Sequence, residues 1–341
     1  MKQPKNKNFN KYIVSLNLNI KKTILKLNDT GLKLVCVVDN KKKLLGTVSD
    51  GDIRRALLKN FNLNHSIQKI MNKKPKILKN SNNQNEINKI YNKYKIKDIP
   101  LLDKNGKLLD IISKNGEKPL ENIVYIIAGG RGKRMMPLTK FNPKPMLGYM
   151  GVPILERILI KIKSEGFKNV IISINYLGKK IEEYFKTGEN LGLKISYLKE
   201  NREMGTAGSL QKLSSFKNNL PIIVSNADLF TNLKFNDILN YHQSNNSDLT
   251  VATKNHQYQS PFGVIENRGR SIIKIKEKPI YNFNINAGVY VINFKMLKYI
   301  KKNSYFDMPD LINKLIKNKK KIAIFPLHEK WKDLQKPSDL S

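Results

Sequence analysis

The stretch Ala128-Gly-Gly-Arg-Gly-Lys-Arg-Met-Met-Pro-Leu-Thr139 directly follows a short apolar run, Ile123-Val-Tyr-Ile-Ile127. Such a run, bounded by glycine, is typical of a buried parallel strand. The glycine-rich loop after it lets backbone amides approach a phosphate without obstruction by Cβ atoms. It is not a Walker A loop, because Arg134 stands where Ser or Thr would bind magnesium, and Met135 replaces the third glycine of a dinucleotide fingerprint. The stretch predicts a phosphate-binding loop of another kind.

The residues after this loop alternate between strand and helix patterns. A helix is expected over residues 153–162, with Pro153 in its first turn and Gly166 beyond its end. Further strands are expected at residues 170–174, 195–198, 222–225, 249–253, 288–292 and 322–325. This alternation predicts an α/β domain, with a mostly parallel mixed sheet and helices on both faces.

The residues before the loop carry one pattern twice. In each copy, a β-rich run ends in Asp, a short turn follows, and a second apolar strand comes next. The copies are Leu34–Asp39 with Leu44–Ser49, and Lys97–Asp103 with Leu108–Ser113. This repeat fits a duplicated βαββα module. A Gly- and Pro-containing linker over residues 116–122 is expected to separate it from the rest of the chain.

The composition narrows the class of protein. A chain of 341 residues with 40% hydrophobic residues suggests about two domains. The net charge of +36 first suggests a nucleic-acid partner. However, only eight of the 63 basic residues are Arg, the residue that makes most specific contacts to bases and phosphates. The excess of positive charge also divides equally, with +18 over residues 1–120 and +18 over residues 121–341. A drift of the composition towards lysine is therefore the preferred explanation of the net positive charge, and no nucleic-acid partner is expected.

Other classes are excluded by local patterns. The first eight residues are polar and do not form a secretory signal, and the longest apolar run, 123–128, is far shorter than the ~18 residues of a membrane span. The single Cys36 lies in an apolar stretch, so we expect a buried thiol and no internal disulfide. The four histidines lack zinc-ligand spacing. A cytoplasmic protein without a membrane partner is expected.

The loop, with the Pro-Lys-Pro at residues 143–145, resembles the signature of sugar-1-phosphate nucleotidyltransferases, although Lys133 replaces the usual Ser or Thr. Further segments match that family in the same order: Glu200–Gly208, Ser225–Asp228, Phe262–Glu266, Glu277–Pro279, Asn286–Tyr290 and Trp331–Leu334. The resemblance spans residues 123–341 and implies a Rossmann-like nucleotidyltransferase catalytic domain over residues 120–341.

The resemblance implies a reaction and three cationic catalytic residues. A sugar 1-phosphate oxygen attacks the α-phosphorus of a nucleoside triphosphate, and pyrophosphate leaves. The nucleophile is already an anion, so positioning and charge neutralisation are the main requirements. Arg134 would hold the β- and γ-phosphates, Lys144 the α-phosphate, and Lys278 the sugar phosphate. Outside these motifs, each lysine would be interpreted as a solvated surface group.

The implied cofactor is Mg²⁺, held by carboxylates. Asp228 follows a predicted strand at its carboxyl end, where open α/β sheets bind ligands; a helix cap is the alternative interpretation. Asp333 is the expected second ligand by its match to the closing motif of guanylyltransferases. Asn293 is the alternative, because some other branches of the nucleotidyltransferase family carry the second ligand after the strand with the Gly-x-Tyr motif, which here is residues 288–290.

The match also implies residues that bind the nucleotide and the sugar. For the nucleotide these are Gly129, Gly130, Arg131, Gly132, Glu200, Gly205 and Thr206. For the sugar they are Gly263, Glu277 and Asn286. A carboxylate such as Glu200 can accept N1–H and the exocyclic amine of guanine together, so GTP is the expected donor.

The N-terminal repeat resembles a tandem CBS pair over residues 8–118. The first copy is expected at about residues 8–64 and the second at about 65–118. Together they imply a regulatory domain over residues 1–119. Ser49 and Asp52 match positions that contact phosphate and ribose of an adenosyl ligand in that family; capping of the following helix is the alternative. The second copy lacks the matching Asp, so at most one regulatory nucleotide per pair is expected. The family also implies a homodimer.

A CBS pair ahead of such a catalytic domain resembles the glucosamine-1-phosphate guanylyltransferases of bacterial legionaminic acid synthesis, used in flagellin glycosylation. Glucosamine 1-phosphate is therefore the expected acceptor, and mannose or another hexose or heptose 1-phosphate the alternative. Two other functions remain open. One is a regulatory nucleotide-binding protein with a weak catalytic half. The other is a basic RNA-binding protein, which would need an aromatic and basic stripe that the sequence lacks.

Overall fold

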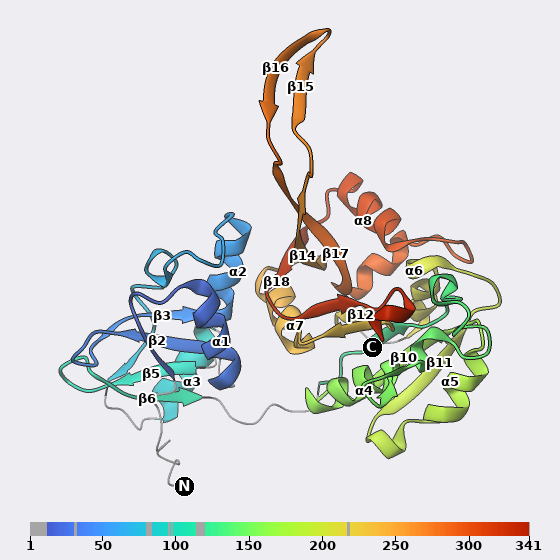
Figure 1. The fold of residues 1–341 in the computed structure, drawn as a ribbon. Coiled ribbons are helices and arrows are strands. Elements are labelled where there is room, and N and C mark those ends of the chain that lie inside the picture. The colour runs from blue at the N-terminus through green and yellow to red at the C-terminus, as the bar shows by residue number, and fades with distance from the viewer. Residues whose placement is uncertain are drawn as a thin grey trace. The chain divides into compact units, whose positions relative to one another are not determined.

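The structure is a computed structural model that describes residues 12–30, 33–79, 84–94, 96, 98–113, 120–216 and 219–340. The chain divides into two compact units, Met1–Gly116 and Glu117–Ser341, coloured blue to cyan and green to red in Figure 1. Residues 116–119 of the expected linker, and Lys97 at the start of the second repeat, lie outside the described residues. Within the described ranges, no helix is long and apolar enough to cross a membrane.

The first unit contains two three-stranded sheets built on one plan. In each sheet, the first strand runs parallel to the middle strand, which pairs antiparallel with the third. The strands are β1 (Ile13–Ser15), β2 (Leu34–Val38), β3 (Leu44–Ser49), β4 (Leu78–Lys79), β5 (Asp98–Leu102) and β6 (Leu108–Ser113). The helices are α1 (Ile20–Thr30), α2 (Asp50–Leu58) and α3 (Gln84–Tyr94). The repeat in the sequence is therefore a repeat of topology.

Cys36 lies at the centre of β2, every residue of which is buried. Burial, together with the charge of Asp98, raises the pKa of this thiol to about 12. The thiol is therefore protonated at neutral pH and acts as a small apolar side chain, as expected from the surrounding sequence.

The second unit is built on a seven-stranded sheet in the order β11-β10-β7-β12-β17-β14-β18. Its strands are β7 (Val124–Ile127), β10 (Asn169–Ile174), β11 (Lys194–Lys199), β12 (Ile222–Asn226), β14 (Leu249–Gln259), β17 (Ile280–Ile292) and β18 (Ile322–Leu327). Only β17 runs antiparallel to its neighbours in this sheet, and the other pairs are parallel. The predicted fold class, a mostly parallel mixed sheet, is confirmed.

Helices cover both faces of this sheet, and β7 contributes side chains to the hydrophobic core on each face. Val124 and Ile126 pack with α4 (Ile154–Ser164), α5 (Gly178–Phe185) and α7 (Phe235–Ser244). Tyr125 faces the other way, into the core beneath α8 (Met308–Lys317). Alternate residues of a strand point to opposite faces, so a continuous apolar run is what a strand buried on both sides requires. The shorter elements are β8 (Gly148–Tyr149), β9 (Val152–Pro153), α6 (Gly205–Gly208), β13 (Leu229–Thr231) and β19 (Trp331–Asp333).

An arm extends from the sheet, because β14 and β17 continue as a ribbon beyond it (Figure 1). The ribbon carries β15 (Val264–Arg268) and β16 (Ser271–Lys276), whose residues are almost all exposed. The sequence predicted strands only at residues 249–253 and 288–292. The outer halves of β14 and β17 pair mainly with each other, so they lack the continuous apolar run that marks a strand of the buried sheet.

Candidate functional site

Two carboxylates, Asp228 and Asp333, meet just beyond the carboxyl end of β12. Asp228 follows this strand, and β13 then pairs antiparallel with β19 so that Leu229 lies opposite Asp333. The amide of Leu334 donates to the carbonyl of Asp228 at 3.2 Å. The structure therefore brings together two carboxylates that are distant in the sequence, at the sheet edge where α/β folds bind ligands.

Cationic side chains of the glycine-rich loop and the following turn reach both carboxylates. Lys144 Nζ lies 2.5 Å from Asp228 Oδ2, and the two side chains are only 14% and 25% exposed. Arg134 donates from Nη1 to Gln335 Oε1 at 2.8 Å, and Gln335 donates from Nε2 to Asp333 Oδ2 at 2.6 Å. Arg134, Lys144, Asp228 and Asp333 thus form one cluster, joined by Gln335.

The cluster fits a divalent metal ion. Within the described part of the chain, Oδ1 of Asp228 and Oδ1 of Asp333 are buried and accept no hydrogen bond. Burial and the charge of Asp228 raise the pKa of Asp333, while Gln335, Lys144 and Arg134 oppose this change. Two carboxylates that repel each other, each with an unused oxygen, are the type of donor set that a hard cation stabilises.

Asn293, the alternative second ligand, lies at the wrong end of the sheet. It follows Ile292, which pairs with Ile222 at the opposite end of β12 from Asp228. Its side chain donates to the carbonyl of Ser247 at 2.7 Å and contacts the imidazole of His242 at 3.1 Å. The alternative was wrong, because β17 runs antiparallel to β12 and ends where β12 begins.

The predicted phosphate loop is tightly packed on one side and open on the other. Gly132 has a φ of 60°, and a Cβ there would lie 3.0 Å from the Cβ of Lys144. A Cβ at Gly130 would meet no atom within 4 Å, so its backbone faces open space. Arg131 pairs with Glu203 at 3.0 Å. Glycine at residue 132 therefore lets the loop lie directly against Lys144.

Glu200, the expected base-recognition residue, lies against the same loop. Its Oε1 accepts a hydrogen bond from the buried hydroxyl of Ser173. A Cβ at Gly129 would lie 3.2 Å from its Oε2. The structure thus places the carboxylate beside the first glycine of the loop, and its contact to a nucleobase stays a prediction.

Gly205 and Thr206 hold a neighbouring segment in place. Gly205 has a φ of 73°, and a Cβ there would lie 2.6 Å from the carbonyl of Phe306. Thr206 donates from its amide and its hydroxyl to Asp307 Oδ1, at 2.9 and 3.1 Å, and its hydroxyl accepts from Met308 N at 2.8 Å. The Thr206 hydroxyl thus donates once and accepts once at the start of α8, and a second lone pair remains. Its expected contact to the nucleotide stays a prediction.

Asn286, one of three expected sugar-site residues, lies in β17 where the register of this strand against β14 shifts. Its amide donates to the Tyr290 hydroxyl at 2.7 Å, and its carbonyl oxygen accepts from Gly288 N at 3.0 Å. A Cβ at Gly288 would lie 2.7 Å from Asn226, the residue at the end of β12. Asn286 therefore lies on the segment that packs against the carboxyl end of β12.

Gly263, Glu277 and Lys278 lie instead on the exposed arm. A Cβ at Gly263 would lie 2.9 Å from Glu277 Oε2, so these two residues are neighbours there. From Asn286 the ribbon runs six residues outward to Ile280, about 20 Å at the usual rise of a strand. The structure does not bring Lys278 to Lys144 and Asp228. That expectation is corrected because β14 and β17 stay paired beyond the sheet.

Ser49 and Asp52 form a capping box at the start of α2. The Ser49 hydroxyl donates to Asp52 Oδ2 at 2.6 Å and accepts from Asp52 N at 3.2 Å. The amide of Ser49 donates to the same carboxylate oxygen at 2.8 Å, and Arg55 pairs with the other. The structure thus shows the capping alternative, and both carboxylate oxygens of Asp52 are engaged within the helix start.

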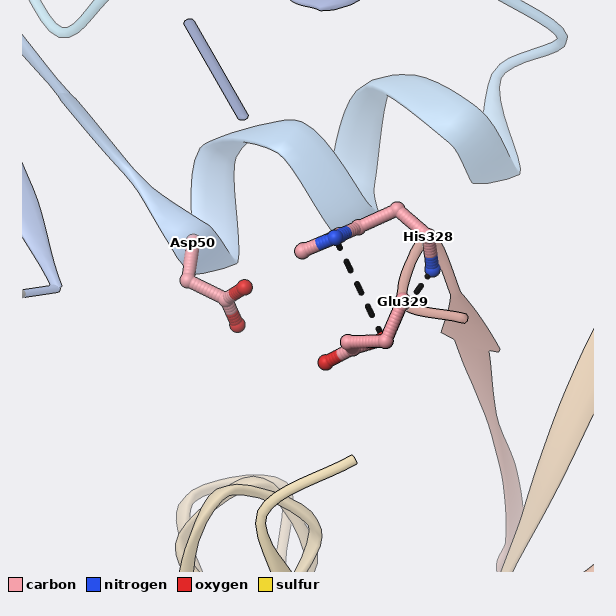
Figure 2. Close-up of side chains that lie close together, drawn as sticks. All are labelled: Asp50, His328 and Glu329. Atoms are coloured by element: carbon pink, nitrogen blue, oxygen red, sulfur yellow. Dashed lines mark hydrogen bonds and ion pairs between the residues drawn. The ribbon is translucent and has the colours of Figure 1, made fainter. Parts of the chain in front are cut away.

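A histidine and a glutamate lie side by side after β18, before β19 begins (Figure 2). The amide of His328 donates to Glu329 Oε2 at 3.1 Å, and its imidazole Nδ1 lies 4.0 Å from the same oxygen. Lys254 Nζ donates to the carbonyl of Glu329 at 2.9 Å. Within the second unit, these contacts connect the neighbouring strands β14 and β18.

Two residues of the site carried no sequence motif, Gln335 and Ser173. Gln335 stands two residues after Asp333, just beyond the end of β19, and this short distance from a predicted ligand could have suggested it. Ser173 is a polar residue inside the apolar run of β10. A lone buried serine next to a predicted ligand segment is only a weak signal, because its partner depends on the neighbouring strand.

Known proteins resemble both parts of the chain. Residues 123–341 match the family model described as nucleotidyl transferase, and residues 10–59 match the CBS domain model. A UTP–glucose-1-phosphate uridylyltransferase of Synechocystis sp. is 26% identical over 234 residues, 63% of this chain and 60% of the relative. The catalytic subunit beta of mannose-1-phosphate guanylyltransferase of Danio rerio is 30% identical over 225 residues, 63% of this chain and 61% of the relative.

A solved structure shares the fold of the second unit. It is a putative glucose-1-phosphate thymidylyltransferase from Bacillus anthracis, with a TM-score of 0.53 and 22% identity over 65% of this chain and 92% of that chain. The chain spans about 60% of the length of the first two curated relatives. The resemblance of residues 123–341 to nucleotidyltransferases is therefore confirmed at family level, and the CBS match covers the first copy of the N-terminal repeat.

Proposed function

Because this chain belongs to the nucleotidyl transferase family, we propose that it transfers GMP from GTP to a sugar 1-phosphate and releases pyrophosphate. One observation carries the proposal: the Lys144–Asp228 ion pair lies beside Asp333 at the mouth of the glycine-rich loop. Mg²⁺ is the proposed metal, with Asp228 and Asp333 as its ligands. The cytoplasm is the proposed compartment.

The proposed chemistry needs no general base. An oxygen of the sugar phosphate forms a bond to the α-phosphorus, the bond from that phosphorus to the bridging oxygen breaks, and the electron pair leaves with pyrophosphate. Lys144 neutralises the charge that develops on the α-phosphate, and Arg134 holds the β- and γ-phosphates. A bound Mg²⁺ would supply further charge neutralisation between the phosphates.

Glu200 supports GTP as the donor. The names of the relatives mention uridylyl, guanylyl and thymidylyl transfer, so similarity to them does not identify the base of the donor nucleotide. An ionised carboxylate only accepts hydrogen bonds. Guanine offers two adjacent donors, N1–H and the 2-amino group, whereas uracil and thymine offer a single N–H between two carbonyl oxygens. A carboxylate beside Gly129 therefore favours guanine.

Glucosamine 1-phosphate is the proposed acceptor, and GDP-glucosamine for legionaminic acid synthesis and flagellin glycosylation the proposed product. The choice of acceptor rests on the CBS module that precedes the catalytic domain. In the proposed division, the CBS module spans residues 1–119 and the catalytic domain residues 120–341. Mannose 1-phosphate is the alternative, supported by the guanylyltransferase relative from Danio rerio. A homodimer with one regulatory nucleotide on each CBS pair is the proposed assembly.

The test is a matrix of substrates read by pyrophosphate release. ATP, CTP, GTP and UTP are each combined with the 1-phosphates of glucosamine, N-acetylglucosamine, mannose and glucose. The highest kcat/KM is expected for GTP with glucosamine 1-phosphate. A preference for UTP would overturn the proposed donor, and absence of pyrophosphate in every combination would overturn the proposed reaction.

A further inference from the structure

Three buried hydroxyl groups form a line that ends on Glu200. The Tyr125 hydroxyl on β7 lies 2.8 Å from Ser209 Oγ, and Ser209 Oγ lies 3.2 Å from Ser173 Oγ on β10. Ser173 then donates to Glu200 Oε1. Tyr125, Ser173 and Ser209 are each 0% exposed. No water therefore competes for these hydrogen bonds.

The line has one direction. Each hydroxyl carries a single hydrogen, and an ionised carboxylate can only accept. Ser173 therefore gives its hydrogen to Glu200, so the contact between the two serines requires Ser209 to donate. Ser209 in turn accepts from Tyr125. All three hydrogen bonds are formed together only in this order, from Tyr125 to Glu200.

The phenol at the far end remains a donor. Burial raises the pKa of Tyr125 above its usual range, the nearby hydroxyls of Ser173 and Ser209 oppose this change, and the charge of Glu200 adds to it. A chain of aligned hydrogen bonds is mutually polarised, so each bond strengthens the next. The line therefore stabilises the charged carboxylate and fixes its orientation.

The second oxygen of Glu200 remains for a ligand. Among the described residues, no hydrogen bond to Glu200 Oε2 is formed, and the backbone of Gly129 is its close neighbour. Any side chain at residue 129 would cover this oxygen, because a Cβ there would lie 3.2 Å away. The oxygen thus faces the loop at which the nucleotide is proposed to bind.

We propose that Ser173 is a positioning residue for base selection: the Tyr125–Ser209–Ser173 line holds Glu200 as a fixed, acceptor-only carboxylate whose Oε2, with its two lone pairs, accepts from two adjacent N–H donors of the nucleobase. This inference rests on the proposed use of GTP. It assigns selectivity for the 2-amino group to a buried network that itself does not contact the base. Without the line, Glu200 can rotate and satisfy a single donor equally well.

The experiment compares GTP with inosine triphosphate, which keeps N1–H and lacks the 2-amino group. In the full-length Ser173→Ala variant, the ratio of kcat/KM for GTP over inosine triphosphate is expected to fall about tenfold, the order of one hydrogen bond to a charged group. The change is expected in the KM for GTP, while kcat and the KM for the sugar phosphate stay unchanged. Tyr125→Phe, which keeps the ring, is expected to lower the ratio by about threefold through the weakened chain.

The matched control is Ser247→Ala, which removes another buried serine hydroxyl, one with no partner among the described residues. Its ratio is expected to equal that of the unaltered protein. If Ser173→Ala fails to fold in thermal unfolding, Tyr125→Phe decides the question. An unchanged ratio in every folded variant, with the unaltered protein preferring GTP, would overturn the inference alone. A preference of the unaltered protein for UTP would overturn the proposed donor and the inference with it.

Discussion

Lys144 Nζ lies 2.5 Å from Asp228 Oδ2, and this contact joins the glycine-rich region to the end of β12. The lysine engages Oδ2 and, among the described residues, Oδ1 of the same carboxylate is buried and has no hydrogen-bond partner. Lys144 is thus placed to meet a phosphate and Asp228 to meet a metal ion. Before substrate binds, the charges of these two side chains neutralise each other. The pair is the part of the site on which the proposed reaction most depends.

Asp228→Asn is expected to lower pyrophosphate release by at least about a hundredfold, because it removes a proposed metal ligand and leaves the partly buried Lys144 without its counter-charge. The measurement is steady-state release from GTP and glucosamine 1-phosphate. Glu183→Gln, on the exposed face of α5 and paired loosely with Lys179 at 3.7 Å, is the charge-matched control. Activity of the Asp228→Asn variant within about threefold of the control would refute the assigned role.

Gln335→Ala is expected to raise the Mg²⁺ concentration needed for half-maximal activity by about fivefold, because Asp333 loses the hydrogen bond that orients it and Arg134 loses its link to the cluster. Activity is titrated with MgCl₂ at saturating substrates. Gln257→Ala, whose side chain bonds Asn282 on the arm, serves as the control. An unaltered Mg²⁺ dependence would show that Gln335 does not orient a metal ligand.

His242 is expected to make stability depend on pH. Its ring is buried between Thr250 and Asn293, and burial lowers its pKa from the ordinary value of 6.5. The unfolded chain therefore binds the proton first as pH falls. The contribution of His242 to the free energy of unfolding is present above pH 6.5 and is lost as pH falls through the lowered folded value.

Urea unfolding at pH 7.5 and pH 5.5 measures this effect. The loss of unfolding free energy between the two pH values is expected to be smaller in His242→Gln than in the unaltered protein, because the variant has no group there that the unfolded chain protonates first. His256→Gln, on the exposed part of β14, is expected to behave as the unaltered protein. Equal losses in all three proteins would contradict the prediction.

Ser49→Ala is expected to lower the stability of the first unit by about 1 kcal/mol, because the start of α2 loses its cap. Ser49→Thr keeps the hydroxyl and is expected to retain most of that stability. Chemical unfolding can be followed by the reactivity of the single thiol, Cys36, which is buried in the folded unit. If alanine and threonine destabilise equally, the hydroxyl does not act as the cap.

The sequence by itself determined the elements and the family. Each strand of the seven-stranded sheet was marked by an apolar run, and the loop at residues 128–139 by its glycines, because both signals are local. Asp228 could be placed at a strand's carboxyl end for the same reason. The duplicated pattern before residue 117 likewise predicted two sheets of one plan.

Tertiary structure alone decided which distant residues meet. The pairing of β13 with β19 puts Asp333 beside Asp228, whereas the antiparallel run of β17 takes Asn293 to the far end of the sheet. The paired extension of β14 and β17 likewise carries Lys278 away. Local periodicity reports how one segment is buried, but strand order and direction follow from packing the whole sheet, so ligand partners and the hydroxyl line beneath Glu200 emerge only in the fold.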